Sequence, residues 1–339
     1  MPSSGVVLIA SPSGPLELLT CIPQRPTAQP PLLFVHGSNC SAACFRAFLP
    51  LIASAGYACY AVSLRGHGKS WQPNAFSFHA LTGLNAYVAD VEAALAHLET
   101  AHPDAAPVLL GHSMGGSVLQ HALTVWEAQR KQKSWRRTAG LVLLASGPLW
   151  GGTVDIARKW QAADAALAKA QSLAPASVPT SPPAPIKGWI PWLQSFAPKS
   201  GIHTPEHVRN KFFSAEASED AVNSWFRDSK SRMESIRVSI SMCWPIAEPR
   251  PVLAAIGRDA PPTGRKVLCI AAEKDCLITA DVSKRNFDAY QSVCEGEEEV
   301  LFVELPGSAH HLMLDIARDR CADTIVAWLQ GMHLKDVKT

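Results

Sequence analysis

The chain has 339 residues, of which 47% are hydrophobic and 18% are charged, and its formal net charge is +2. This composition predicts a globular protein with a large core, and it gives no sign of a nucleic-acid-binding surface or a membrane-spanning stretch. The first residues lack the pattern of a secretory signal, so we expect a cytoplasmic protein; organelle import is only weakly indicated.

The nine cysteines predict free thiols. Their number is odd, and Cys59 and Cys269 lie inside apolar strand-like runs, which favours reduced and mostly buried side chains. Cys40 and Cys44 lack the spacing of a zinc knuckle, and no second pair matches them. We therefore expect no metal site.

Apolar strand-like runs alternate with helical patterns over residues 1–146. The alternation predicts strands at 5–10, 16–22, 31–36, 57–64, 107–110 and 141–145, and helices at 45–55, 81–102 and 116–129. The first two strands are expected to form a hairpin. The run 141–145 contains five apolar residues without alternation, as in a strand of a parallel sheet that has helices on both faces.

The alternation breaks between residues 147 and 263 and resumes after that. Inside the break, the patterns predict a helix at 153–173, a Pro-rich stretch at 174–198, short helices within 203–242 and a Pro-rich return linker at 245–262. Beyond it they predict strands at 266–272 and 299–305 and helices at 280–293 and 315–332. We predict a doubly wound, mostly parallel α/β core, residues 1–146 and 264–339, with a helical cap at 147–263 inserted after the sixth strand.

A G-x-S-x-G motif runs from Gly111 to Gly115 and lies between a predicted strand and a predicted helix. This is the setting of a nucleophile elbow, in which a strained turn exposes the serine oxygen, here that of Ser113. The following helix directs its N-terminal amides and the positive end of its dipole at the same point. The alternative is a Gly-Ser turn that merely begins a helix.

A serine nucleophile needs a base within hydrogen-bond reach and an acid that orients the base. In a parallel sheet these groups are expected at the carboxyl ends of strands. His310 and His311 directly follow the strand predicted at 299–305. We favour His310 as the base because the small residues before it predict a closely packed loop, and we keep His311 as the alternative base.

The acid and the oxyanion donors are sought at the ends of other strands. Asp275 follows the strand at 266–272 and is the candidate acid, whereas its neighbour Glu273 is expected to pair with Lys274. The tetrahedral oxyanion of acyl transfer needs preorganised donors. The backbone N–H groups of Met114 and Ser38 are the candidate oxyanion hole, with Asn39 as the second choice after Ser38.

Together these motifs resemble the serine hydrolases of the α/β-hydrolase fold, esterases and lysophospholipases among them. The resemblance rests on the segments 34–38, 64–70, 111–116, 273–275 and 306–310, and it covers the two core ranges. It implies a cofactor-free enzyme that cleaves carboxylic esters through an acyl-enzyme, with the catalytic triad Ser113, Asp275 and His310. In this chain Ser63 and Leu64 stand where that fold usually has an acid before the 64–70 loop.

Other activities on this fold stay open as alternatives. Dehalogenases and epoxide hydrolases use an aspartate at the elbow, so Ser113 argues against them. C–C hydrolases and lyases keep the serine, and some ligand-binding receptors on this fold keep the whole triad. The fold alone does not decide among these functions.

The predicted cap is rich in tryptophan. Its five tryptophans are Trp160, Trp189, Trp192, Trp225 and Trp244. Packing of the cap onto the core is the favoured explanation for them, and the alternative is a pocket for a small-molecule ester with an apolar acyl or alcohol portion. The stretch 188–196 predicts a mobile flap that meets a lipid-like substrate or makes transient contact with a lipid surface. No pattern in the sequence indicates an oligomeric state.

Overall fold

The computed structural model describes residues 1–25, 27–130, 137–173, 202, 204–229, 234–256, 263–296 and 298–334. An eight-stranded sheet lies at its centre, with strand order β1-β2-β4-β3-β5-β6-β7-β8. The strands are β1 (Ser3–Ile9), β2 (Leu16–Ile22), β3 (Leu32–Val35), β4 (Cys59–Val62), β5 (Val108–His112), β6 (Gly140–Leu144), β7 (Val267–Ala272) and β8 (Val300–Leu305).

The sheet is parallel apart from its leading hairpin. β1 pairs antiparallel with β2 and β2 pairs antiparallel with β4, whereas all pairs from β4 to β8 are parallel. Every residue of β3, β4, β5, β6 and β7 is buried, which explains why these strands are apolar without alternation. The predicted doubly wound, mostly parallel sheet is therefore confirmed.

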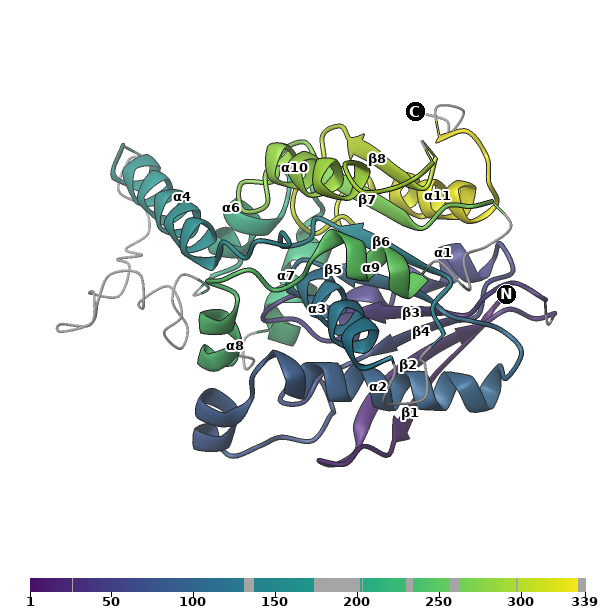
Figure 1. The fold of residues 1–339 in the computed structure, drawn as a ribbon. Helices are drawn as coiled ribbons and strands as arrows, with labels where there is room; N and C mark the ends of the chain where they lie inside the picture. Colours follow the sequence, from purple (N-terminus) through teal and green to yellow (C-terminus); the bar gives the residue numbers. More distant parts are fainter. Residues whose placement is uncertain are drawn as a thin grey trace.

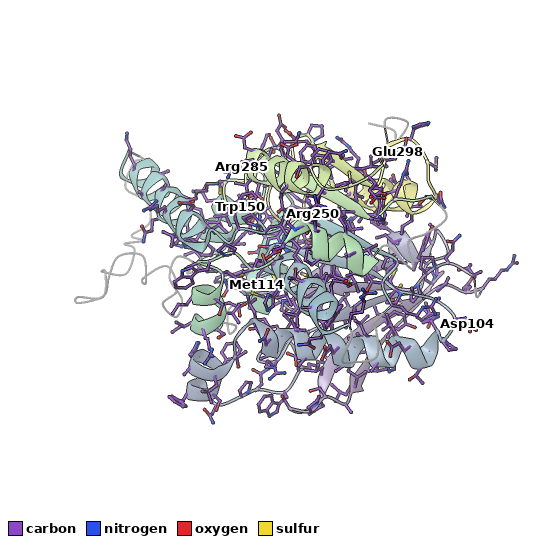
Figure 2. All side chains as sticks on the ribbon, viewed as in Figure 1. Asp104, Met114, Trp150, Arg250, Arg285 and Glu298 are labelled. Atoms are coloured by element: carbon purple, nitrogen blue, oxygen red, sulfur yellow. The ribbon has the colours of Figure 1, made fainter. Side chains whose placement is uncertain are left out.

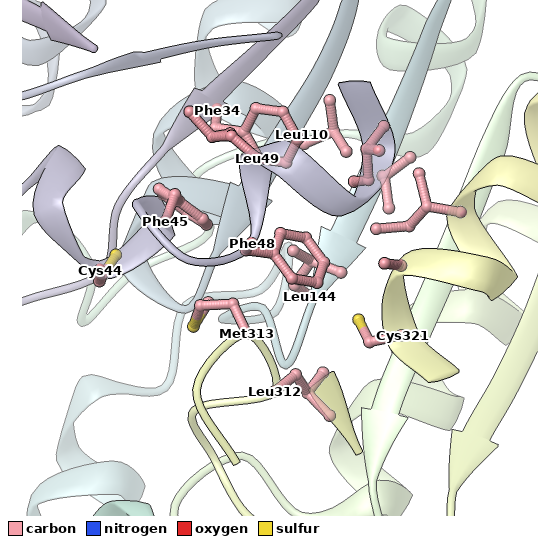
Figure 3. Close-up of a cluster of buried hydrophobic side chains, with 14 of the residues drawn as sticks. Phe34, Cys44, Phe45, Phe48, Leu49, Leu110, Leu144, Leu312, Met313 and Cys321 are labelled. Carbon is pink, nitrogen blue, oxygen red and sulfur yellow. The ribbon is translucent and has the colours of Figure 1, made fainter. Parts of the chain in front are cut away.

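Helices cover both faces of this sheet (Figure 1). The helices α1 (Leu49–Ala53) and α11 (Arg318–Leu329) pack on one face, where Phe34, Phe48 and Leu110 meet Cys321 in a single core (Figure 3). The helices on the other face are α2 (Leu84–Ala101), α3 (Met114–Gln129), α9 (Pro249–Ile256) and α10 (Ala280–Gln291). These two apolar layers hold the strand ends, and hence the loops after them, in place.

The residues between β6 and β7, called the β6–β7 segment below (145–266), carry the other helices. They are α4 (Thr153–Leu173), α6 (Pro205–Phe212), α7 (Glu219–Ser229) and α8 (Ile236–Ser241), with α9 at the end of the segment. Figure 1 shows α4, α6 and α8 at one end of the sheet, on the left. Among the described residues, no helix has the length and apolar character needed to cross a membrane.

Three predicted elements differ from the structure. The helix expected at 45–55 is a 3-10 turn over Ala42–Phe45 followed by the short α1, and a π-helical turn, Ser77–Leu81, precedes α2. The return linker expected at 245–262 contains α9, because Pro249 and Pro251 lie in its first turn, where their missing N–H groups are not needed. The last helix begins at Arg318 rather than at 315, since the Asp315 carboxylate accepts the N–H of Ile316 and keeps this stretch in turns.

Candidate active site

Ser113 stands on a strained turn between β5 and α3. Its backbone has φ 52° and ψ −121°, a conformation that residues with a side chain rarely adopt. The turn closes because three glycines allow close backbone approach: a Cβ on Gly111 would strike the backbone of Gly116, and one on Gly115 would strike the carbonyl of Val35. The geometry is that of a nucleophile elbow.

His310 and Asp275 lie beside this serine in a continuous hydrogen-bonded chain. His310 Nε2 is 3.0 Å from Ser113 Oγ, and His310 Nδ1 is 2.7 Å from Asp275 Oδ2. The other carboxylate oxygen, Asp275 Oδ1, accepts the backbone N–H groups of Leu277 and Ile278 at 2.8 and 2.9 Å. Both oxygens of the buried carboxylate are therefore bonded, and they orient the imidazole so that Nε2 faces the hydroxyl.

His311, the alternative base, lies in a different environment. Its ring packs against the rings of Phe212, Phe213, Trp225 and His112, with centroids 4.9 to 5.4 Å away. Neither ring nitrogen has a hydrogen-bond partner among the described residues, and burial holds the pKa of His311 well below its usual value. Of the two adjacent histidines, the structure brings only His310 to the serine.

His112, inside the G-x-S-x-G motif, supports the histidine loop. Its Nε2–H donates to the backbone carbonyl of His310 at 2.9 Å. Burial, and next the nearby His310, hold the pKa of His112 well below its usual value, so the ring stays neutral. No local pattern predicts this role of His112, because its partner lies 198 residues further along the chain.

The loop after β3 passes directly beside the serine. A Cβ on Gly37 would lie 2.8 Å from His112 Nδ1 and 2.9 Å from Ser113 Cβ, so the backbone approaches the elbow as closely as a glycine permits. Ser38 and Asn39 follow, and Asn39 turns the chain with φ 58°. Met114 is the first residue of α3 (Figure 2). Backbone N–H groups in the first turn of a helix lack intrahelical partners. These are the two segments that carry the candidate oxyanion donors.

His36 fixes the start of that loop. Its Nε2 accepts the N–H of Leu64 at 3.1 Å, and its Nδ1–H donates to the Gly37 carbonyl at 2.8 Å. Burial, followed by the neighbouring His67, lowers the pKa of His36 to about 3. A neutral ring thus bonds to two loops at once, and no motif in the sequence pointed to this role.

The loop at 64–70 is held by buried polar contacts. Arg65 Nη2 lies 2.7 Å from Asp90 Oδ1, and Arg65 Nε also bonds to that carboxylate. Glu17 Oε2 accepts Ser63 Oγ–H at 2.8 Å and the N–H of Lys69 at 2.9 Å. A carboxylate from β2 thus lies where the sequence lacks the usual acid before this loop.

The prediction that Glu273 pairs with Lys274 is wrong. Glu273 Oε2 instead accepts the N–H of Gly307 at 2.7 Å, and Lys274 Nζ lies 3.7 Å from Glu216. The reason is local: Glu273 directly follows β7 and faces the turn after the neighbouring β8. Its bond to Gly307 helps to fix the loop that carries His310.

Helix α6 brings apolar surface next to His310. It begins at a Thr204–Pro205 pair, in which the threonine hydroxyl accepts the N–H of His207. At its other end, the centroid of the Phe212 ring is 6.0 Å from that of His310. The rings of Trp160 and Trp225 lie 5.4 Å and 4.8 Å from the Phe212 ring.

The remaining tryptophans of the segment do not join this cluster. Trp244 is 63% exposed, whereas Trp189, Trp192 and the predicted flap at 188–196 lie outside the described residues. In the part of the chain that the structure describes, all nine cysteines are free, and no group of three His, Cys, Asp or Glu side chains is arranged to hold a metal ion.

A doubly wound sheet with a serine on a strained strand-to-helix turn is the fold of the α/β hydrolases. A sequence model described as the alpha/beta hydrolase family matches residues 32–324, and the chain belongs to this family. A search of curated protein sequences gives no match.

Several solved structures share the fold. A highly thermostable carboxyl esterase from Bacillus coagulans has 14% identity and a TM-score of 0.64, over 97% of this chain and 99% of its own. A bromoperoxidase from Bacillus anthracis has 15% identity and a TM-score of 0.62, over 96% of this chain and 100% of its own. A haloalkane dehalogenase variant from Bradyrhizobium elkanii has 16% identity and a TM-score of 0.61, over 97% of both chains. At these identities the likeness concerns the fold.

Proposed function

We propose that this protein is a serine hydrolase that cleaves carboxylic esters through an acyl-enzyme. The observation that carries the proposal is the unbroken hydrogen-bonded chain from Asp275 through His310 to Ser113. The serine at the elbow favours this chemistry over reactions that need a carboxylate nucleophile. The esterases among the similar structures support the same class of reaction.

In the proposed mechanism, Ser113 Oγ attacks the ester carbonyl while His310 Nε2 takes the hydroxyl proton. The backbone N–H groups of Ser38 and Met114 donate to the oxyanion of the tetrahedral intermediate. As the intermediate collapses, His310 returns the proton to the leaving alcohol. A water, deprotonated by the same imidazole, then attacks the acyl-enzyme; the bond between the acyl carbon and Ser113 Oγ breaks, His310 returns the proton to Oγ, and the acid is released. Asp275 keeps Nδ1 protonated and stabilises the imidazolium throughout.

We propose further that residues 147–263, apart from α9, which packs on a face of the sheet, form a cap over this site, and that 1–146 and 264–339 form the catalytic core. The support is the aromatic cluster of Trp160, Phe212 and Trp225, in which the Phe212 ring lies 6.0 Å from the His310 ring. An apolar wall at this place favours an apolar acyl or alcohol portion of a small-molecule substrate. Contact of the cap with a lipid surface stays a prediction.

Ser113→Ala tests the proposal directly. We expect kcat for a short-chain aryl ester to fall about 10⁶-fold and labelling by a fluorophosphonate probe to disappear, because both need the same oxygen nucleophile. Ser54→Ala, which changes an exposed serine at the end of α1, is the matched control and keeps both. Full esterase activity in pure Ser113→Ala protein would refute the mechanism.

The wild-type result separates this function from its alternatives. A protein that does not react with the probe and hydrolyses no ester is a binding protein on this fold. A protein that reacts with the probe but hydrolyses no ester of graded chain length uses its serine for C–C hydrolysis or lyase chemistry.

A further inference from the structure

Asp315 is a buried carboxylate outside the proposed triad that accepts four hydrogen bonds. Oδ2 accepts the N–H of Ser214 at 2.9 Å and that of Ala309 at 2.8 Å. Oδ1 accepts the Ser214 hydroxyl at 2.5 Å and the N–H of Ile316 at 2.8 Å. The side chain therefore uses all its acceptor positions on neighbouring backbone and on one serine.

These partners belong to two separate parts of the fold. Ala309 immediately precedes His310 in the loop after β8, whereas Ser214 follows α6 in the β6–β7 segment. A second bond runs in parallel, because the N–H of His311 donates to the Phe212 carbonyl at 3.0 Å. The backbone on both sides of His310 is thus bonded to the end of α6, on one side through the Asp315 carboxylate.

We propose that Asp315 is a positioning residue, which joins the β6–β7 segment to the loop that carries His310 and so holds the imidazole in reach of Ser113. This inference rests on the proposed function. None of the four hydrogen bonds that Asp315 accepts comes from a triad side chain. Its effect passes through the backbone of Ala309, one residue before the base, and depends on the position of Ser214.

The chemistry of the four bonds requires a carboxylate. The asparagine of Asp315→Asn has one oxygen and one NH₂ group, and the NH₂ group cannot accept an N–H. If the NH₂ group replaces Oδ2, it faces the N–H groups of Ser214 and Ala309. If it replaces Oδ1, it faces the N–H of Ile316. Either orientation loses at least one bond to the backbone. Ser214→Ala removes only the hydroxyl bond and keeps the bond from Ala309. The two variants therefore weaken the connection between the β6–β7 segment and the His310 loop to different degrees.

Steady-state kinetics on the full chain provide the first test. We expect Asp315→Asn to lower kcat about 10- to 100-fold with KM changed less than about threefold, because a misplaced base slows the chemical step more than it weakens substrate binding. Ser214→Ala should lower kcat about 3- to 10-fold. Since Ser214 acts through Asp315, the double variant should be no slower than Asp315→Asn alone.

Ser235→Ala is the matched control. Ser235 is also a buried serine of the β6–β7 segment, but its hydroxyl donates to the Thr82 carbonyl at 2.6 Å, in another part of the core. It should lower the melting temperature and leave kcat unchanged. If Asp315→Asn does not fold, the comparison of Ser214→Ala with Ser235→Ala decides: equal kcat values for these two variants would overturn the proposal.

The second test needs no substrate. In histidine-¹⁵N-labelled protein, the Nδ1–H proton of His310 bonded to Asp275 should give a protected downfield resonance, which Ser113→Ala retains and Asp315→Asn weakens or loses. A purely structural role would lower the melting temperature and leave this resonance intact, and that outcome would overturn the proposal. If the wild type reacts with neither ester nor probe, the proposed function fails, while the resonance still reports whether Asp315 positions the imidazole.

Discussion

Two adjacent histidines in one loop have opposite environments in this structure. The His310 ring lies between a hydroxyl and a carboxylate, and both of its nitrogens are bonded. The His311 ring lies among aromatic rings, and its nitrogens have no partner among the described residues. The sequence narrowed the base to these two residues, but only the packing around each ring distinguishes a proton acceptor from a buried neutral side chain.

Substitution of each histidine should separate these roles. We expect His310→Ala to lower kcat nearly as much as Ser113→Ala does, because the two side chains act as a unit. His311→Leu should keep kcat within about threefold and change the free energy of unfolding by less than about 1 kcal/mol, since a buried imidazole without partners gains little from its nitrogens. Steady-state kinetics measure kcat, and urea denaturation measures the free energy of unfolding. A large loss of kcat in His311→Leu and a small one in His310→Ala would make His311 the base.

At the scale of elements, the site depends on close contact between the β3 loop and the elbow. The loop after Val35 approaches the strand-to-helix turn at Ser113 so closely that only a glycine, Gly37, fits at the contact. His36 then bonds the β3 loop to Leu64, and Arg65 with Asp90 bonds that second loop to α2. These contacts fix the backbone on which the proposed oxyanion donors lie.

Gly37→Ala should therefore impair the reaction. The added methyl would lie 2.9 Å from Ser113 Cβ and 2.8 Å from His112 Nδ1, so the loop must move away from the elbow. We expect kcat to fall about 100-fold, comparable to the loss of one oxyanion donor, with a smaller change in KM. Gly296→Ala is the control, because its methyl would meet only the flexible side chain of Glu299. Equal kcat values for the two variants would show that the β3 loop does not take part.

At the scale of the whole molecule, the sheet brings together side chains that are far apart in the chain. Ser113 and His310 are 197 residues apart, and they meet because β5 and β8 end at the same edge of one sheet. The same packing encloses His36, His112 and His311, whose pKa values burial lowers. These rings are neutral in the folded protein, and this makes its stability depend on pH.

The free energy of unfolding should decrease as the pH falls below about 6.5. Below that value each of these histidines binds a proton in the unfolded chain but not in the folded protein, so acid favours unfolding. Each should contribute about 1.4 kcal/mol per pH unit, and for His36 this continues down to its folded pKa of about 3.

Urea denaturation between pH 7.5 and 4.5 measures this slope. His311→Leu should reduce the slope by about the contribution of one histidine and leave stability above pH 7 nearly unchanged. An identical slope in wild type and variant would show that the folded protein protonates His311 as readily as the unfolded chain does.

Much of the fold could be predicted because the signals for it are local. Continuous apolar runs mark the buried strands, and Gly111, Gly115 and Gly116 mark the turn that displays Ser113. In a parallel sheet the carboxyl ends of the strands share one edge, so the loops with Asp275 and His310 could be placed near the serine without coordinates. Helix α9 was missed because prolines in a first helical turn resemble a linker.

The amino-acid sequence by itself determined the order of strands and helices along the chain, the strained serine turn, and the small set of residues able to act with it, because spacing and residue type suffice for these. Only the tertiary structure showed that His310, and not His311, lies within hydrogen-bond distance of Ser113, and only it showed that Glu17 and Asp315 hold the surrounding loops. Those roles come from hydrogen bonds and burial created by segments distant in the chain, and no local pattern encodes them.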